Sequence, residues 1–492
     1  MNVTRRSFCG ALGAASPLWP SAVRRPNVLY ILVDQWRAQA AGYAGDSNAR
    51  TPTLDRLAAE SSHFANAVSG CAVCSPYRGS VMTGQYPVSH GVVINDVPLE
   101  PKGPALGQSF ASAGYRTGYI GKWHLYGSPD GKYGRRQAFI PKDKRFGFDY
   151  WKAFECSHNY NRSPYFEGDD STPRLWKGYD AIAQTEDACA FVASHARQRD
   201  PFFLFLSLGP PHFPYGTAPE SYRALYEQRP IKLRPNVPEE GRERATADLR
   251  GYYSHIAALD DCVKNLLAAL DKYGAAQDTI VLFTSDHGDM LNCHGLPNKQ
   301  HPWDESVCVP FLLRYPRKLG ARGRVIPQPV DAPDIMPTLL GLAGIPIPES
   351  VQGSDLSALA AGSTPSDPDA GALLNLPVTF SQARGCGFAE YRGLRTARHT
   401  YVRSIHGPWL LYDNRSDPYQ MRNLRGRPEQ NAVQAKLERQ LDATLRRLND
   451  DFLPGDRYLE RAGLTHYREA NVPVRGCPSP WGDWAPTMKP AS

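Results

Sequence analysis

Apolar residues in the first two thirds of this 492-residue chain fall into short, nearly continuous runs. The first run covers residues 26–34 and ends in the carboxylate of Asp34, and similar runs follow at 115–121, 201–208, 279–286 and 309–315. Runs of this kind are typical of strands buried on both faces of a parallel sheet. We therefore predict that these strands lie side by side in one buried sheet.

Between these runs, apolar residues recur three and four positions apart. The pattern is clearest over residues 247–273, where it predicts a long amphipathic helix. Strands that alternate with helices favour an α/β fold, here a large mixed, mostly parallel sheet sandwiched by helices.

Beyond residue 370 the apolar runs become short and alternate with polar residues. The runs at 378–381, 388–396, 399–404 and 409–413 predict a small antiparallel sheet, and residues 428–450 predict a charged helix. We expect a main domain over 26–370, a C-terminal subdomain over 371–455 and a tail over 456–492 that lies on the surface.

Composition excludes several classes of protein. The 56 Lys and Arg exceed the 49 Asp and Glu by seven, a mild excess without a long basic run, which does not favour a nucleic-acid partner. There is no stretch of about 18 apolar residues, so no transmembrane segment is predicted. Ten irregularly spaced cysteines are too sparse for a disulfide scaffold. The expected protein is a globular enzyme.

The N-terminus carries Arg5 and Arg6 followed by a weakly apolar stretch of small residues. This pattern resembles a Tat export signal, and the alternative is an ordinary basic N-terminus. A signal over residues 1–25 predicts a periplasmic or secreted protein. Because Tat export takes place after folding, a cytoplasmic enzyme could modify the protein before it is exported.

Acidic residues end two of the predicted strands. Asp34 is followed by Gln35, and Asp286 is followed by His287 and, two positions later, Asp289. In open α/β sheets, ligands bind beyond the carboxyl ends of the strands. Two such ends with oxygen and nitrogen ligands resemble the halves of a metal site, although a single acid at a strand end is commonplace.

A segment from Cys74 to Gly84 carries the sharpest signal. Pro76 suits the first turn of a helix, which puts Cys74 at the helix N-terminus, where exposed N–H groups favour an anion. Arg78, one turn later, adds a fixed positive charge near residue 74. The segment therefore predicts a nucleophile position at an anion-binding helix end.

The same segment, C-x-P-x-R followed by Thr83-Gly84, resembles the signature of the formylglycine-dependent sulfatases of the alkaline-phosphatase-like superfamily. The similarity extends from about residue 26 to about residue 425 and includes late pieces around Leu411 and Asn423. It implies a sulfuric ester hydrolase that cleaves O-sulfate monoesters.

The resemblance also implies a cofactor set. A maturation enzyme, as partner, would oxidise Cys74 to Cα-formylglycine (3-oxoalanine), whose hydrated aldehyde acts as the nucleophile and can expel sulfate by breaking its own C–O bond. A divalent ion, calcium, would be held by the residue at 74 together with four others: Asp34, Gln35, Asp286 and His287. Many members have Asp in place of Gln35, and Asn is also common in place of His287, so this cage carries less negative charge and a softer nitrogen ligand.

The remaining roles implied by the resemblance concern the sulfate group. Arg78 would hold the formylglycine hydroxyls, and His124 would contact one of them. Lys122 and Lys299 would pair with sulfate oxygens. His212 would protonate the leaving alcohol.

Some alternative interpretations remain open from the sequence. Cys71 and Cys74 have the spacing of a redox pair, although Cys71 is better explained as a small packing residue. Both histidines at 124 and 212 would also fit hydrogen-bonded core positions, and Lys299 would fit a solvated surface charge. His294 either lines the sulfate pocket or caps its loop.

Aromatic residues are concentrated in the segment 148–179, among polar side chains. Such a segment suits sugar rings, so we expect a substrate-recognition insert for a sulfated carbohydrate; the alternative is a loop packed on the core. Two other functions are compatible with the sequence: a phosphonate or phosphodiester hydrolase of the same superfamily, and a non-catalytic glycan-binding protein with unmodified Cys74.

Overall fold

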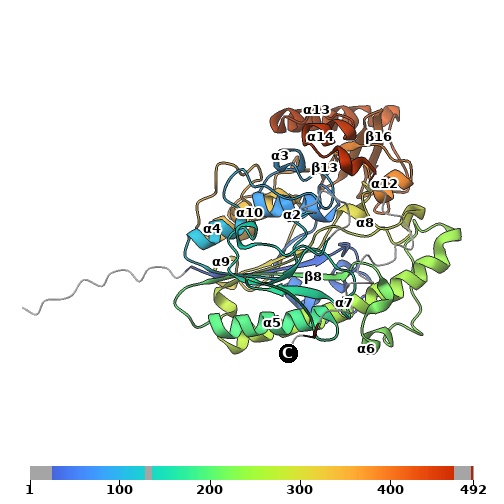
Figure 1. Cartoon of the computed structure of the whole chain (residues 1–492). Coiled ribbons are helices and arrows are strands. Elements are labelled where there is room, and N and C mark those ends of the chain that lie inside the picture. The colour runs from blue at the N-terminus through green and yellow to red at the C-terminus, as the bar shows by residue number, and fades with distance from the viewer. Residues whose placement is uncertain (1–24, 128–135, 470–488, 491–492) are drawn as a thin grey trace, which may run out of the picture.

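The structure is a computed structural model that describes residues 25–127, 136–469 and 489–490 (Figure 1). Its main feature is an eleven-stranded sheet through the centre of the molecule. In spatial order the strands are β11 (Arg324–Ile326), β2 (Ser62–Phe64), β10 (Phe311–Arg314), β9 (Thr279–Ser285), β1 (Asn27–Asp34), β8 (Phe202–Pro211), β4 (Arg116–Lys122), β5 (Tyr150–Phe154), β6 (Pro164–Glu167), β7 (Asp170–Leu175) and β17 (Lys489–Pro490).

The five central strands of this sheet, from β9 to β5, run parallel to one another. Strand β10 is antiparallel to β9, and β6 is antiparallel to both β5 and β7. The predicted large mixed, mostly parallel sheet is therefore confirmed. Each of the five apolar runs in the sequence forms one of its strands.

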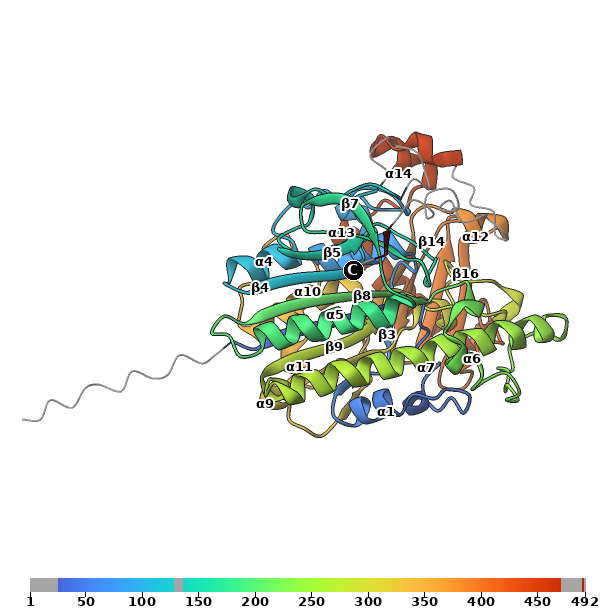
Figure 2. The same cartoon turned by 60° about the horizontal axis from the view of Figure 1, so that its bottom comes forward.

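Two hydrophobic cores lie on opposite faces of the sheet because successive side chains of a strand point to opposite sides. In β1, Tyr30 packs into one core and Ile31 into the other. One face is covered by α2 (Cys74–Thr83), α4 (Leu106–Ser112) and α10 (Ala332–Ala343), and the other by α1 (Pro52–Ala59), α5 (Asp180–His195) and α7 (Arg242–Lys272) (Figures 1 and 2). The predicted helix at 247–273 is thus the C-terminal part of α7.

The smaller elements connect these layers. Strands β3 (Ala67–Val68) and β12 (Val330–Asp331) form a two-stranded parallel sheet. The short helices are α3 (Pro87–His90), α6 (Glu220–Arg223), α8 (Asp304–Val307), α9 (Pro316–Leu319), α11 (Ser357–Ala361) and α12 (Ser381–Gly385).

A four-stranded antiparallel sheet follows, made of β13 (Gly371–Leu376), β14 (Tyr391–Thr396), β15 (His399–Ser404) and β16 (Gly407–Asp413). It lies with α13 (Asn431–Leu448) at one end of the molecule (Figure 1), and leucines of α13 pack on it. The predicted strand at 378–381 is wrong. Strand β14 begins at Tyr391, which already pairs with Leu376, so residues beyond Leu376 have no strand to pair with there.

Part of the predicted tail is helical, since α14 spans Gly455–Arg461. The export signal predicted over residues 1–25 falls, apart from residue 25, outside the described residues, as do residues 470–488 of the tail. Within the described ranges, none of the helices combines the length and the apolar character needed to cross a bilayer.

Gly121 allows β4 and β8 to approach each other next to the site. Its φ is +102°, and a Cβ there would lie 2.1 Å from the carbonyl oxygen of Ser207. We expect Gly121→Ala to lower the free energy of unfolding by about 3 kcal/mol or more, through overpacking and left-handed strain together. Urea unfolding measures the loss.

Gly168→Ala is the matched control for that substitution. Gly168 also has a positive φ, +54°, but a Cβ there meets no atom within 4 Å. It should therefore lose only the strain contribution, about 1–2 kcal/mol. Equal losses in the two variants would refute the close approach as the cause.

Candidate active site

Four central strands deliver polar residues to the same edge of the large sheet. Strand β1 ends at Asp34, β9 is followed by Asp286 and His287, β4 ends at Lys122, and β8 is followed by His212. All four strands are parallel, so their carboxyl ends meet at one edge. The residues that the sequence places at the ends of different strands therefore lie together at one edge of the sheet.

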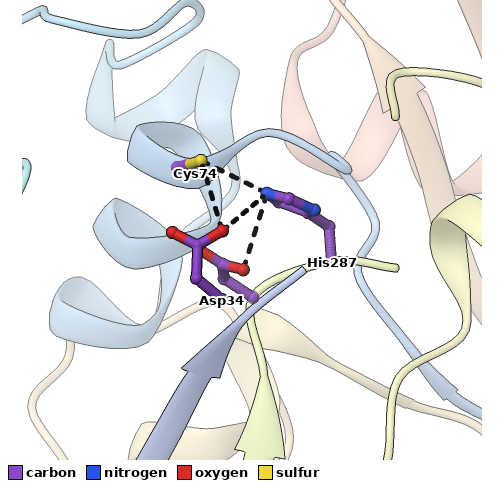
Figure 3. A group of neighbouring side chains, drawn as sticks. Asp34, Cys74 and His287 are labelled. Atoms are coloured by element: carbon purple, nitrogen blue, oxygen red, sulfur yellow. Dashed lines mark hydrogen bonds and ion pairs between the residues drawn. The ribbon is translucent and has the colours of Figure 1, made fainter. Parts of the chain in front are cut away.

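Cys74 comes to this edge on the first turn of α2, as predicted. Its Sγ lies 3.2 Å from Nε2 of His287 and 3.9 Å from Oδ1 of Asp34 (Figure 3). The side chain is buried, with 2 % of its surface exposed.

The ligand atoms of Asp34, Cys74, Asp286 and His287 all lie within 4.8 Å of one another. Nε2 of His287 is 3.5 Å from Oδ1 of each aspartate. Nδ1 of the same ring donates to the carbonyl oxygen of Gly288 at 3.0 Å, which leaves the lone pair of Nε2 directed at the cluster. Two carboxylates and a free imidazole lone pair fit a divalent cation.

Arg78 holds the outer oxygens of the two aspartates. Its Nη2 donates to Oδ2 of Asp286 at 3.0 Å and lies 3.5 Å from Oδ2 of Asp34. Its Nη1 donates to Oγ of Ser207 at 2.7 Å and to the carbonyl oxygen of Lys122 at 3.0 Å. The guanidinium thereby fixes both carboxylates with Oδ1 facing inward.

Two buried lysines flank Cys74 and its partners. Nζ of Lys122 contacts Oδ2 of Asp34 at 2.5 Å. Nζ of Lys299 donates to Oε1 of Gln35 at 3.1 Å and to Sγ of Cys74 at 3.2 Å. Lys299 is 4 % exposed, so it is a residue of the site and not a solvated surface charge.

These cations govern the ionisation of the site. Burial raises the pKa of Asp34, but Lys122 and other neighbouring cations outweigh it and hold that pKa well below its usual range. For Cys74, burial and Asp34 raise the thiol pKa, whereas Lys122 and Lys299 lower it, and the cations prevail. The cations therefore stabilise negative charge on Asp34 and Cys74, whereas burial and the charge of Asp34 raise the pKa of Asp286.

Two histidines near Cys74, His212 and His124, have pKa values shifted in opposite directions. His212 accepts a hydrogen bond at Nε2 from Lys299 (3.0 Å), and burial together with Lys299 and His158 holds its pKa well below the usual range. Burial also lowers the pKa of His124, but Cys156 and Asp96 outweigh it and raise that pKa to about 9. His124 bonds Oδ1 of Asp96 at 3.1 Å.

The family profile described as Sulfatase matches residues 26–345, and the profile described as N-sulphoglucosamine sulphohydrolase, C-terminal, matches residues 292–447. The chain belongs to the sulfatase family. It is therefore a sulfuric ester hydrolase, and its family implies a divalent metal and a formylglycine.

Characterised relatives agree with this assignment of the sulfatase. The chain is 42 % identical to an ulvan-active sulfatase of Formosa agariphila, over 89 % of this chain and 84 % of that protein. An endo-4-O-sulfatase of Bacteroides thetaiotaomicron is 30 % identical over 86 % of this chain and 92 % of the other. A solved structure concerned with glycosaminoglycan metabolism by the same bacterium has a TM-score of 0.78 at 29 % identity and covers 89 % of this chain and 98 % of that one.

The loop that carries Lys299 into the sulfatase site is strained and braced. Five residues of this loop have positive φ values between 44° and 76°: Leu291, Asn292, His294, Asn298 and Gln300. The backbone N–H of Ala383 in α12 donates to Oε1 of Gln300 at 3.1 Å. Tyr391 of β14 donates from its hydroxyl to the carbonyl oxygen of Gln300 at 3.4 Å. We call these two bonds the C-terminal brace.

His294 belongs to the support of this loop. Its Nε2 lies 3.1 Å from Nδ2 of Asn236, its backbone N–H donates to the carbonyl oxygen of Asn236, and its ring packs against Trp303. Of the two roles left open by the sequence, these contacts favour the loop cap.

Cys71 and Cys74 are both free thiols in the sulfatase, and their environments differ. Burial raises the pKa of the Cys71 thiol far above its usual range, while cations lower the pKa of Cys74. Cys71 packs in the hydrophobic core between the sheet and α2. These contrasting environments support the packing role and not the redox pair.

The aromatic segment 148–179 is packed on the core instead of forming an exposed face for sugar rings. Its strands β5, β6 and β7 extend the main sheet, and the buried rings include Trp151, Phe166 and Trp176. The expectation of a stacking surface is therefore wrong for these rings. The segment reaches the site through Tyr160, whose hydroxyl donates to the carbonyl oxygen of His212 at 2.8 Å.

Three residues of the site were given no role of their own from the sequence. Ser207 accepts a hydrogen bond from Arg78, and Asp96 accepts one from His124. Asp289 accepts a hydrogen bond from Nε2 of Gln35 at 2.6 Å. Asp289 lies in the same strand-end motif as Asp286, which was the available signal. Asp96 sits in a loop whose sequence carries none.

Proposed function

We propose that this sulfatase removes O-sulfate from a sulfated carbohydrate, with Cys74 converted to formylglycine. The observation that carries the proposal is the position of Cys74 Sγ, which faces Asp34, His287 and Lys299 at the helix N-terminus. The hydrated aldehyde would supply an oxygen nucleophile at this point. A maturation enzyme that acts on Cys74 is part of the proposal.

The metal we propose is calcium, held by the residue at 74 and by four other side chains. Asp34 and Asp286 offer their inward oxygens, Gln35 offers its amide oxygen, and His287 offers Nε2. When bound, the ion supplies a Lewis-acid charge that stabilises negative oxygens. The predominance of oxygen ligands supports calcium over softer ions.

The chain's own cations would hold the sulfate group. Lys122, which contacts Asp34, and Lys299, which contacts Cys74, would bind sulfate oxygens, while Arg78 keeps the two aspartates in position. Because these groups are buried and already oriented, they stabilise developing charge without reorganisation.

His212 would hold the proton for the leaving alcohol. Its Nδ1 donates to the carbonyl oxygen of Phe213 at 2.8 Å, which points Nε2 at Lys299 and the nucleophile. A bound sulfate would place negative charge beside this ring and raise its pKa, since an opposite charge favours the protonated form. Nε2 would then protonate the departing oxygen.

We expect His212→Ala to lower kcat/KM on alkyl and sugar sulfates by about 10²- to 10⁴-fold, because such alkoxides need a proton to leave. Activated aryl sulfates leave as stable phenolates, so their loss should stay below about 10-fold. Steady-state rates on both substrate types measure the difference. Equal losses would contradict the acid role.

The carbohydrate part of the proposal rests on the relatives, which include an ulvan-active sulfatase and an endo-4-O-sulfatase. The test is a panel of sulfated oligosaccharides, aryl sulfates, phosphodiesters and phosphonate monoesters, offered to the matured protein and to its Cys74→Ala variant. Release of inorganic sulfate from an oligosaccharide at the highest rate supports it. Faster turnover of a phosphorus ester would favour the phosphonate or phosphodiester hydrolase instead.

We also propose that the protein is exported to the periplasm or secreted, on the basis of Arg5 and Arg6. Replacing both by lysine should retain the protein in the cytoplasm, because the twin arginine is the feature that the export machinery reads. Fractionation of the host cells measures its location.

A further inference from the structure

The side-chain amide of Gln35 lies between a hydrogen-bond donor, Lys299, and a hydrogen-bond acceptor, Asp289. It follows β1 with a φ of +69°, is fully buried, and donates its backbone N–H to Oδ1 of Asp286 at 3.1 Å. Its side-chain oxygen faces Nζ of Lys299 at 3.1 Å, and its side-chain nitrogen faces Oδ2 of Asp289 at 2.6 Å. The two ends of one amide therefore contact an ammonium and a carboxylate.

Asp289 is surrounded by donors. Besides Gln35, the hydroxyl of Tyr215 donates to Oδ2 at 2.5 Å, and the backbone N–H of Leu291 donates to Oδ1 at 3.1 Å. Three donors and a fully buried carboxyl group define Asp289 as an acceptor. Tyr215 and Leu291 also fix the position of this carboxylate.

These partners permit a single orientation of the Gln35 amide. In the reverse orientation, the NH₂ group would face the ammonium of Lys299 and the carbonyl oxygen would face the carboxylate of Asp289, and both contacts would be repulsive. The orientation is thus determined by chemistry at both ends.

We propose that Asp289 is a positioning residue that holds the Gln35 amide with Oε1, and not Nε2, directed into the metal site. The inference rests on the proposed function, because it concerns the ion that Gln35 would help to bind. An amide nitrogen cannot ligate a hard cation, so a free amide would lose part of its population to an incompetent orientation. A carboxylate at position 35 has no such requirement.

The first test is the affinity of the protein for calcium, measured by calorimetry and by the calcium-dependent rise in Tm, without substrate. Asn at position 289 offers either an oxygen or a nitrogen to the amide, so that Lys299 alone still favours one orientation. We expect Asp289→Asn to weaken calcium binding about 10- to 100-fold. Tyr215→Phe, which removes one donor to Asp289, should weaken it about fivefold.

Asp260→Asn is the matched control. Asp260 is also a buried carboxylate, but it accepts the backbone N–H groups of Thr53 and Leu54 and contacts none of the residues of the site described above. It should lower the free energy of unfolding while leaving the affinity for calcium as in the parent. Circular dichroism verifies that each variant is folded.

The decisive test exchanges donor and acceptor. Gln35→Asp alone places a carboxylate against Asp289 and should weaken calcium binding through repulsion. Gln35→Asp combined with Asp289→Asn restores a donor facing an acceptor with the same total charge. We expect the double variant to recover affinity to within about tenfold of the parent, whereas independent effects would multiply the two losses.

The outcomes separate the inference from the proposed function. Parent-like affinity in Asp289→Asn, or a double variant as weak as the two losses multiplied, overturns the role of Asp289 while calcium binding by the parent stands. A parent protein that calcium neither binds nor stabilises overturns the proposed calcium site, and the role of Asp289 with it.

Discussion

Cys74→Ala is expected to abolish sulfate ester hydrolysis, with a loss of about 10⁵-fold or more, while the fold remains intact. The nucleophile disappears, whereas Arg78, Lys122 and the two aspartates keep their contacts with one another. The lost packing of one buried thiol lowers the free energy of unfolding by only about 1 kcal/mol. Released sulfate and urea unfolding measure the two effects.

Cys71→Ala provides the matched control, since it removes another buried thiol three residues earlier. It should retain activity and show a similar small change in stability. Peptide mass spectrometry over residues 57–78 adds a direct readout, because conversion of Cys74 lowers the mass by the difference between CH₂SH and CHO. Normal turnover by Cys74→Ala would refute the nucleophile, and an unshifted peptide from the native host would favour the glycan-binding alternative.

Arg78→Met is expected to damage both stability and catalysis. Arg78 is 2 % exposed and is the shared partner of Asp34 and Asp286. Without it the two buried carboxylates lose a common counter-charge, which we expect to lower the free energy of unfolding by about 3–5 kcal/mol. In the folded fraction, kcat should fall at least about 10³-fold, because the nucleophile and the aspartates lose their alignment. Rates are normalised to the fraction of converted Cys74.

Arg392→Met separates these two effects. Arg392 is fully buried in β14 and pairs with Asp450 at 2.5 and 3.1 Å. It should lose a comparable amount of stability, yet its folded fraction should hydrolyse sulfate esters like the parent. Equal losses of kcat in the two variants would show that the effect of Arg78 is general destabilisation.

The sequence predicted the centre of the molecule well. Buried parallel strands have a continuous apolar pattern, and their carboxyl ends must meet at one edge, so Asp34 and Asp286 were brought together by topology alone. Pro76 located the start of α2 and with it Cys74. These features follow from local composition and from one rule of sheet geometry.

Other features depend on tertiary contacts that no local pattern encodes. The pairing of Gln35 with Asp289, and of His124 with Asp96, joins residues on different loops. In the small antiparallel sheet, the partner strand decides where β13 ends, and the apolar run at 378–381 carries no information about that partner. For the aromatic segment, sequence alone did not distinguish rings that face solvent from rings that fill a core.

The C-terminal brace connects α12 and β14 to the loop that carries Lys299, although neither element supplies a group that contacts Cys74. Gln300 neighbours Lys299, and Ala383 and Tyr391 hold Gln300 from the far end of the chain. Exchanging this sheet between related enzymes, or truncating the chain ahead of it, would remove both hydrogen bonds that hold Gln300 beside Lys299. The position of Lys299 therefore depends on contacts made more than eighty residues later in the chain, and we expect a foreign C-terminal subdomain to preserve activity only where it supplies equivalent hydrogen bonds to Gln300.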